Sequence, residues 1–242
     1  MRGNSSKASQ SLILVLILLQ TVGCAMKKSL PPPVPVDPFQ GTSEDTNRLQ
    51  ESLFKGDQEI LSNQDIERIL SARITLSDRH RLAVLGLNPR AIWSAELADL
   101  EAEHSERFLQ ALRSVTQLTQ VRVMPTLLVP EKRTVPYLRE AAARFQADLL
   151  LVYSTRIQTF RRDRFIGTDE VRARCLAESV LLDVRSGIVA HTARTAEGIA
   201  ARKSPGDLNF SETIAKAEGD ATGKALLKLA DAVVAYLQDA SK

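Results

Sequence analysis

The chain has 242 residues, of which 44% are hydrophobic and 25% charged, so it is long enough for one or two domains with an ordinary core. Its formal net charge is +3. Arg2 and Lys7 lie within the first 23 residues, which contain no acidic residue, so the remainder is close to neutral. This composition does not favour a nucleic-acid-binding protein, which usually presents a strongly basic face.

Residues 1–23 have the pattern of a secretory signal peptide. A polar start with two basic residues leads into residues 12–19, which are all apolar. This stretch is too short for a permanent membrane helix, which needs ~20 residues. The alternatives are an ordinary secreted protein and an uncleaved anchor helix.

Thr21-Val22-Gly23-Cys24 resembles the lipobox of bacterial lipoproteins. The resemblance implies cleavage before Cys24 and acylation of its sulfur. Several acyl chains anchor a protein stably, because each buried methylene contributes ~0.8 kcal/mol. Ala25 stands where an aspartate favours retention in the inner membrane, so the resemblance implies an outer-membrane protein facing the periplasm.

Residues 24–61 are expected to form a lipid-anchored, proline-rich tether. Residues 31–38 contain five prolines in eight positions, and a polyproline segment extends by ~3 Å per residue. A proline-rich ligand for an aromatic groove is the alternative. A single α/β domain is expected over residues 62–242.

Two helices and a strand are expected at the start of this domain. A helix begins at Ser62, and a buried strand over 81–87 ends at Asn88-Pro89. A long helix follows over 92–115. The apolar positions of the first helix are Ile66, Ile69 and Leu70, and the stripe of the second is Trp93, Leu97, Leu100, His104, Phe108, Leu112 and Val115.

A second strand is expected over 121–129, where Pro125 indicates an edge or a bulge. The next helix covers 134–146, and Pro136 lies in its first turn, where a missing N–H is tolerated.

Three strands are expected in the second half of the domain. Leu149–Tyr153 is an unbroken apolar run, typical of a central strand covered on both faces, and residues 154–160 then alternate. Strands over 171–184 and 188–196 flank Arg185-Ser186-Gly187, a hairpin signal.

The last helix is expected over 211–238, where Gly219 and Gly223 weaken the middle by about 1 kcal/mol each. Its inner face comprises Ile214, Ala217, Ala221, Leu226, Leu229, Val233 and Leu237. The fold class is therefore α/β (α+β): a mixed sheet of about five strands with helices packed on it, a long C-terminal helix and an antiparallel hairpin.

No motif for catalysis is found. His80, His104 and His191 do not have metal-ligand spacing, and the chain lacks a G-x-S-x-G elbow and a phosphate-binding glycine loop. We therefore assign no catalytic, cofactor-binding or metal-binding residue and expect a protein that is not an enzyme. With Cys24 acylated, Cys175 is either a buried thiol or an intermolecular link.

The residues from Arg161 to Gly167 are expected to form a hairpin loop. Arg161, Arg162, Arg164 and Phe165 concentrate three arginines beside an aromatic ring, a combination enriched at binding hot spots. We expect this loop to contact a partner; a solvated hairpin tip is the alternative.

Three segments carry a resemblance over residues 80–240: Ala147–Tyr153, Asp183–Gly187 and Asp207–Ser211 before an alanine-rich helix. They resemble the rhombotarget-type envelope lipoproteins and, more distantly, the α/β domain of the lipoproteins that activate penicillin-binding proteins and of the curli-secretion lipoprotein.

The resemblance implies a non-catalytic interaction or assembly module with an envelope protein as partner. A small-ligand-binding or sensing module and an enzyme acting on envelope glycan or lipid remain alternatives.

Overall fold

The computed structural model describes residue 53 and residues 62–72, 79–87, 95–162 and 169–240. All of them belong to the second of the two units into which the chain divides, residues 43–242. The predicted signal peptide, Cys24 and all of the tether except Leu53 lie outside the described residues.

The described elements alternate between helix and strand as far as β3 and then form an antiparallel meander. In chain order they are α2 (Asn63–Ser71), β1 (His80–Gly86), α3 (Ala95–Arg113), β2 (Leu118–Val123), a 3-10 turn (Thr126–Leu128), α4 (Val135–Arg144), β3 (Leu149–Arg162), β4 (Glu170–Asp183), β5 (Val189–Arg202) and α5 (Phe210–Asp239).

The five described strands form one mixed sheet in the order β2-β1-β3-β4-β5. Strand β1 is parallel to β2 and to β3, whereas β4 is antiparallel to both β3 and β5. This arrangement confirms the predicted fold class.

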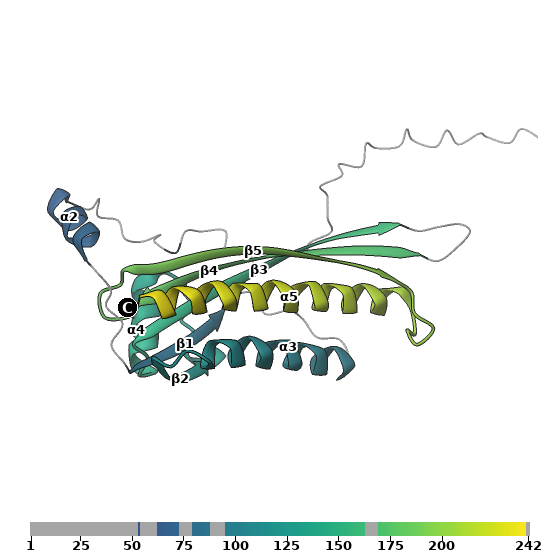
Figure 1. Cartoon of the computed structure of the whole chain (residues 1–242), viewed down its shortest axis with the longest axis horizontal. Helices are drawn as coiled ribbons and strands as arrows, with labels where there is room; N and C mark the ends of the chain where they lie inside the picture. The colour runs from purple at the N-terminus through teal and green to yellow at the C-terminus, as the bar shows by residue number, and fades with distance from the viewer. Residues whose placement is uncertain (1–52, 54–61, 73–78, 88–94, 163–168, 241–242) are drawn as a thin grey trace, which may run out of the picture. The chain divides into compact units, whose positions relative to one another are not determined.

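Helices cover the two faces of the sheet unequally. Helices α3 and α5 run side by side on one face, with α5 along β4 and β5 (Figure 1). Helix α4 covers the other face only where β3 begins, and its Leu138, Ala141 and Ala142 pack in one cluster with Leu150 and Leu182. The sheet is therefore double-sided at one end and single-sided at the other.

Strand β3 shows this change along its own length. Leu149–Val152 are all buried, which confirms the predicted central strand, and residues 155–160 alternate between half-buried and exposed. The alternation begins where α4 no longer covers the sheet.

The predicted bounds of two strands and one loop are wrong. Strand β2 runs from Leu118 to Val123 rather than over residues 121–129. It ends before Pro125 because proline has no N–H for the ladder, and the Pro125 carbonyl instead accepts a bond from the N–H of Leu128. Strand β5 continues six residues beyond the predicted end, to Arg202. Arg161 and Arg162 pair with Val171 and Glu170 and therefore belong to β3 rather than to a hairpin loop.

Helix α5 has the predicted inner face, since all seven of its predicted positions are buried. The expectation that Gly223 only weakens this helix is incomplete. A Cβ at position 223 would overlap the imidazole of His104 on α3, so the glycine lets the two helices approach closely.

The start of α5 is held by a polar network. Asn209 caps the helix by accepting a bond from the N–H of Glu212. Asp207 accepts bonds from the Thr213 hydroxyl (2.7 Å), the Ser204 N–H (3.0 Å) and the Lys216 ammonium (3.0 Å). These donors, Thr213 first, lower the pKa of Asp207 to about 2.

Helix α2 begins where predicted, with the Ser62 side chain accepting a bond from the N–H of Asp65. Its apolar positions Ile66, Ile69 and Leu70 are exposed. Across the described ranges, no helix is both long enough and apolar enough to cross a membrane.

Candidate interaction surface

Helix α5 fixes which face of β3–β5 is covered. The Thr159 hydroxyl donates to Glu218 (2.6 Å), the Thr195 hydroxyl donates to the carbonyl of Ala225 (2.8 Å), and Glu197 pairs with Lys228. All three contacts join odd-numbered strand positions to α5. The even-numbered positions of the same strands therefore point to the opposite face.

Strand β4 shows the two faces most clearly. Val171, Ala173 and Cys175 are buried on the side of α5, whereas Arg172 and Arg174 between them are exposed. This is the period-two alternation of a half-covered strand. The alternating sequence therefore puts the small apolar residues in the core beneath α5 and the arginines on the opposite face of the sheet. We call this opposite face the open face.

The register gathers further arginines on this open face. Arg162 of β3 lies opposite Glu170, which lies opposite Arg202 of β5, and Glu178 lies opposite Arg194. We call the exposed arginines of this surface the arginine face. They are Arg156, Arg162, Arg172, Arg174, Arg194 and Arg202.

Only part of this charge is neutralised. Arg202 pairs with Glu170 at 2.7 Å, and Arg194 pairs with Glu178 at 3.3 Å. Among the described residues, no carboxylate pairs with the other arginines of the face. These are Arg156, Arg162, Arg172 and Arg174.

A hollow of about 680 Å³ lies in this surface. Arg172 and Arg174 line it from β4, and Phe160, 53% exposed, lines it from β3. On β5 the positions opposite the two arginines are Ala200 and Gly198. Because these residues are small, they leave space beside the guanidinium groups.

Only part of the predicted interaction loop lies on this surface. Arg162 belongs to the arginine face and Arg161 lines the hollow, whereas Arg164 and Phe165 lie outside the described residues. Sequence reasoning missed Arg172 and Arg174. Their signal was the strict alternation of arginine with small apolar residues from Val171 to Cys175.

In the described part of the chain, no group of three or more His, Cys, Asp or Glu side chains could hold a metal ion. His191 stacks on Tyr236 of α5 with ring centroids 4.6 Å apart, and burial lowers its pKa. His104 lies 3.4 Å from Asp220, yet neither of its ring nitrogens makes a hydrogen bond within the described residues.

No family model and no curated protein matches the chain. Among solved structures, the chain is similar to the hypothetical protein CT253 from Chlamydia trachomatis (15% identity over 66% of this chain and 98% of that chain, TM-score 0.38). It is also similar to a minor lipoprotein from Acinetobacter baumannii (12% identity, 69% and 92%, TM-score 0.31) and to rare lipoprotein B from Shewanella oneidensis (10% identity, 66% and 94%, TM-score 0.32). Similarity at this level defines neither a family nor a function.

Proposed function

We propose that the protein is a lipoprotein anchored through Cys24, in which a tether carries a non-catalytic module that binds an acidic protein of the cell envelope. The lipobox and signal pattern at residues 1–24 support the anchor, and the outer membrane is the proposed location. The observation that carries the binding function is the charge of Arg156, Arg162, Arg172 and Arg174, with which no carboxylate of the described residues pairs.

Exposed arginines without acidic partners are suited to protein recognition. A guanidinium group donates a planar pair of hydrogen bonds that matches a carboxylate, and it is more weakly hydrated than an ammonium group. Arg172 and Arg174 lie about 7 Å apart along one strand, so two carboxylates can bind in parallel. Phe160 adds exposed aromatic surface of the kind enriched at interfaces.

The direct test is site-specific photo-crosslinking in intact cells. A photoreactive amino acid at Gln158, which lies opposite Arg174 on the open face, should form an adduct with an acidic envelope protein. The same group at Gln120, an exposed position on β2, is the matched control. Arg172→Glu with Arg174→Glu should abolish the Gln158 adduct, whereas Arg79→Glu should leave it intact.

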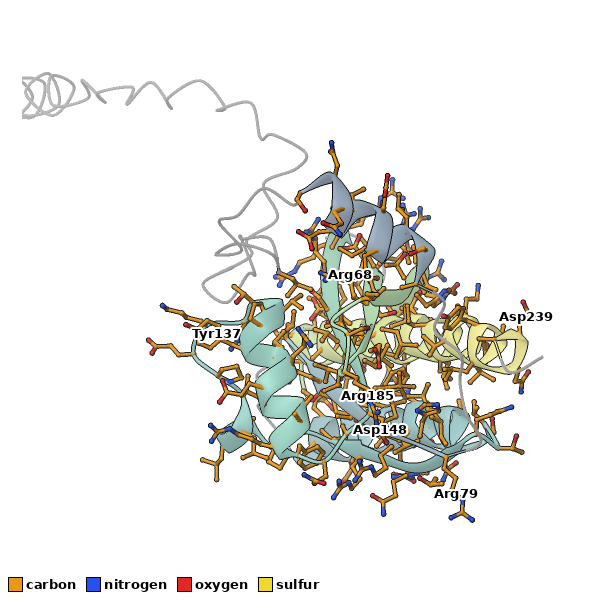
Figure 2. The ribbon with its side chains drawn as sticks, turned by 90° about the vertical axis from the view of Figure 1, so that its left-hand side faces the viewer. Arg68, Arg79, Tyr137, Asp148, Arg185 and Asp239 are labelled. Carbon is orange, nitrogen blue, oxygen red and sulfur yellow. The ribbon has the colours of Figure 1, made fainter. Side chains whose placement is uncertain are left out.

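The choice of Arg79 as a control follows from its position. It is exposed and directly precedes β1, at the end of the sheet where β3 begins, and Figure 2 labels it with Asp148 and Arg185 in the view of that end. The arginine face lies toward the other end of β3. Equal adducts from Gln158 and Gln120, or adducts that persist after charge reversal, would rule out this surface as the interface.

A small-ligand-binding module is the second candidate, because the hollow beside Phe160 has a volume in the range of ligand sites. In that case a small anionic ligand from a cell extract should remain bound during purification. Native mass spectrometry of the purified protein, compared with its Arg172→Glu/Arg174→Glu variant, separates the two candidates.

A further inference from the structure

Strand β5 forms one edge of the sheet over 14 residues. Its inner side pairs with β4 from Val189 to Arg202. Within the part of the chain that the structure describes, no backbone hydrogen bond joins its outer side to another segment. A long edge of this kind has free N–H and C=O groups that can pair with an added strand.

The outward residues near this edge are small. Ala196, Gly198 and Ala200 are exposed on the open face, between the free edge and the arginines of β4. Side chains of a strand added beside β5 would lie two strand spacings, about 10 Å, from β4. The combined lengths of a glutamate and an arginine side chain bridge that distance when only small residues lie between them.

From these two features we infer that β5 accepts an extended acidic segment of the partner protein as an additional strand. Its backbone pairs with the outer edge of β5, and its alternate carboxylates reach Arg172 and Arg174 across Ala200 and Gly198. This inference rests on the proposed function and specifies the partner's binding segment: an extended stretch with acidic residues at every second position.

Charge favours an acidic segment over a second copy of this chain. Antiparallel pairing of β5 with its own copy would place two arginine faces on the same side of one continuous sheet and would bring no carboxylate to Arg172 or Arg174. Like charges close together in a sheet are destabilising. An acidic strand instead supplies the carboxylates that Arg172 and Arg174 lack among the described residues.

The test uses the full-length purified protein and synthetic peptides of about ten residues, long enough to span the small-residue stretch at ~3.3 Å per residue. One peptide alternates threonine with glutamate, and its control alternates threonine with lysine. The glutamate peptide should bind and slow hydrogen exchange at alternate amides of β5. The lysine peptide should do neither.

Two sets of variants distinguish the contribution of the arginine charges from that of the open space above the small residues of β5. Arg172→Ala with Arg174→Ala should weaken binding of the glutamate peptide at least tenfold, because each lost charge-assisted bond accounts for a substantial part of the affinity. Ala200→Phe should also weaken binding by filling the path across β5. Thr192→Phe, an exposed position on the same face of the same strand outside the small-residue stretch, should have little effect. Circular dichroism establishes that each variant is folded.

Three results would overturn the inference. Arginine-dependent binding without protection of β5 amides would show that the acidic segment binds the face but adds no strand, and would leave the proposed function standing. Protection of β5 that grows with protein concentration in the absence of peptide would show pairing with a second copy. Equal binding of the lysine peptide would exclude charge as the basis of recognition. The proposed function itself is tested separately, by the photo-crosslinking experiment at Gln158.

Discussion

Gly223 illustrates how one residue fixes the distance between two helices. Gly223→Ala should destabilise the protein by up to about 2 kcal/mol, although alanine normally stabilises a helix by about 1 kcal/mol relative to glycine. The reason is steric, because the added methyl group overlaps the partly buried ring of His104, and overpacking of a core costs about 1–3 kcal/mol. Urea denaturation measures the change in unfolding free energy.

A double-mutant cycle supplies the control for this prediction. In a His104→Ala background the obstacle is gone, so Gly223→Ala should become neutral or stabilising. Destabilisation of the same size in both backgrounds would contradict the steric explanation.

The reactivity of Cys175 tests which face of β4 is buried. The thiol is fully buried, so a soluble thiol reagent should label it only after denaturation. The neighbouring variant Arg174→Cys should be labelled in the native protein, because position 174 is exposed. Peptide mass spectrometry distinguishes the two sites, and rapid native labelling of Cys175 would show that the faces are assigned wrongly.

The burial of Cys175 follows from its sequence, whereas the role of its neighbours does not. Alternation from Val171 to Cys175 separates inward from outward residues, and of the two alternatives for Cys175 the structure shows the buried thiol. Nothing local shows that the outward face stays uncovered, since that depends on α5 packing on the other side and on α4 covering only one end. The sequence therefore indicates the adjacent pair Arg161 and Arg162 but not Arg172 and Arg174.

At the scale of elements, the polar network at the start of α5 makes the stability of the fold depend on pH in the acidic range. The folded-state pKa of Asp207 is about 2, below its ordinary value of 3.8. The ionised carboxylate therefore stabilises the fold above pH ~4, and this stabilisation is lost as the pH falls toward 2. Asp207→Asn should lower the Tm at pH 5, and its difference from the wild type should shrink between pH 4 and 2.

Asp231→Asn is the matched control for the Asp207 prediction, because it alters an exposed aspartate of the same helix. Thermal melts followed by circular dichroism at several pH values give the comparison. A Tm difference between Asp207→Asn and the wild type that stays constant from pH 5 to pH 2 would contradict the assigned pKa.

The sequence predicts the types and order of the elements better than their ends. Unbroken apolar runs, alternation and helical stripes identify the five strands and three long helices, because each reflects how many faces are buried. The sequence does not predict residues 197–202 as part of β5. They include alanines, a glycine and two charged residues, Glu197 and Arg202, and this composition is a weak strand pattern. Their pairing with β4 makes them a strand, and that pairing is not visible in the local sequence.

At the scale of the whole molecule, the proposed anchor makes a prediction about the native protein. Its mass spectrum should show a chain that begins at an acylated Cys24, and Cys24→Ser should retain residues 1–23. Cys175→Ser serves as the control and should be processed normally. An intact leader or an unmodified thiol at position 24 in the native protein would remove the basis for the proposed location.

The position of α5 at the end of the described elements also constrains when the domain can fold. All five strands are synthesised before the helix that covers one face of their sheet, and Leu151, Val171 and Leu181 share a core cluster with α5. A nascent chain that lacks α5 therefore leaves this apolar face open to water. The core of the described elements is therefore completed only once α5 has been synthesised, and an apolar face exposed before that point favours aggregation of the nascent chain.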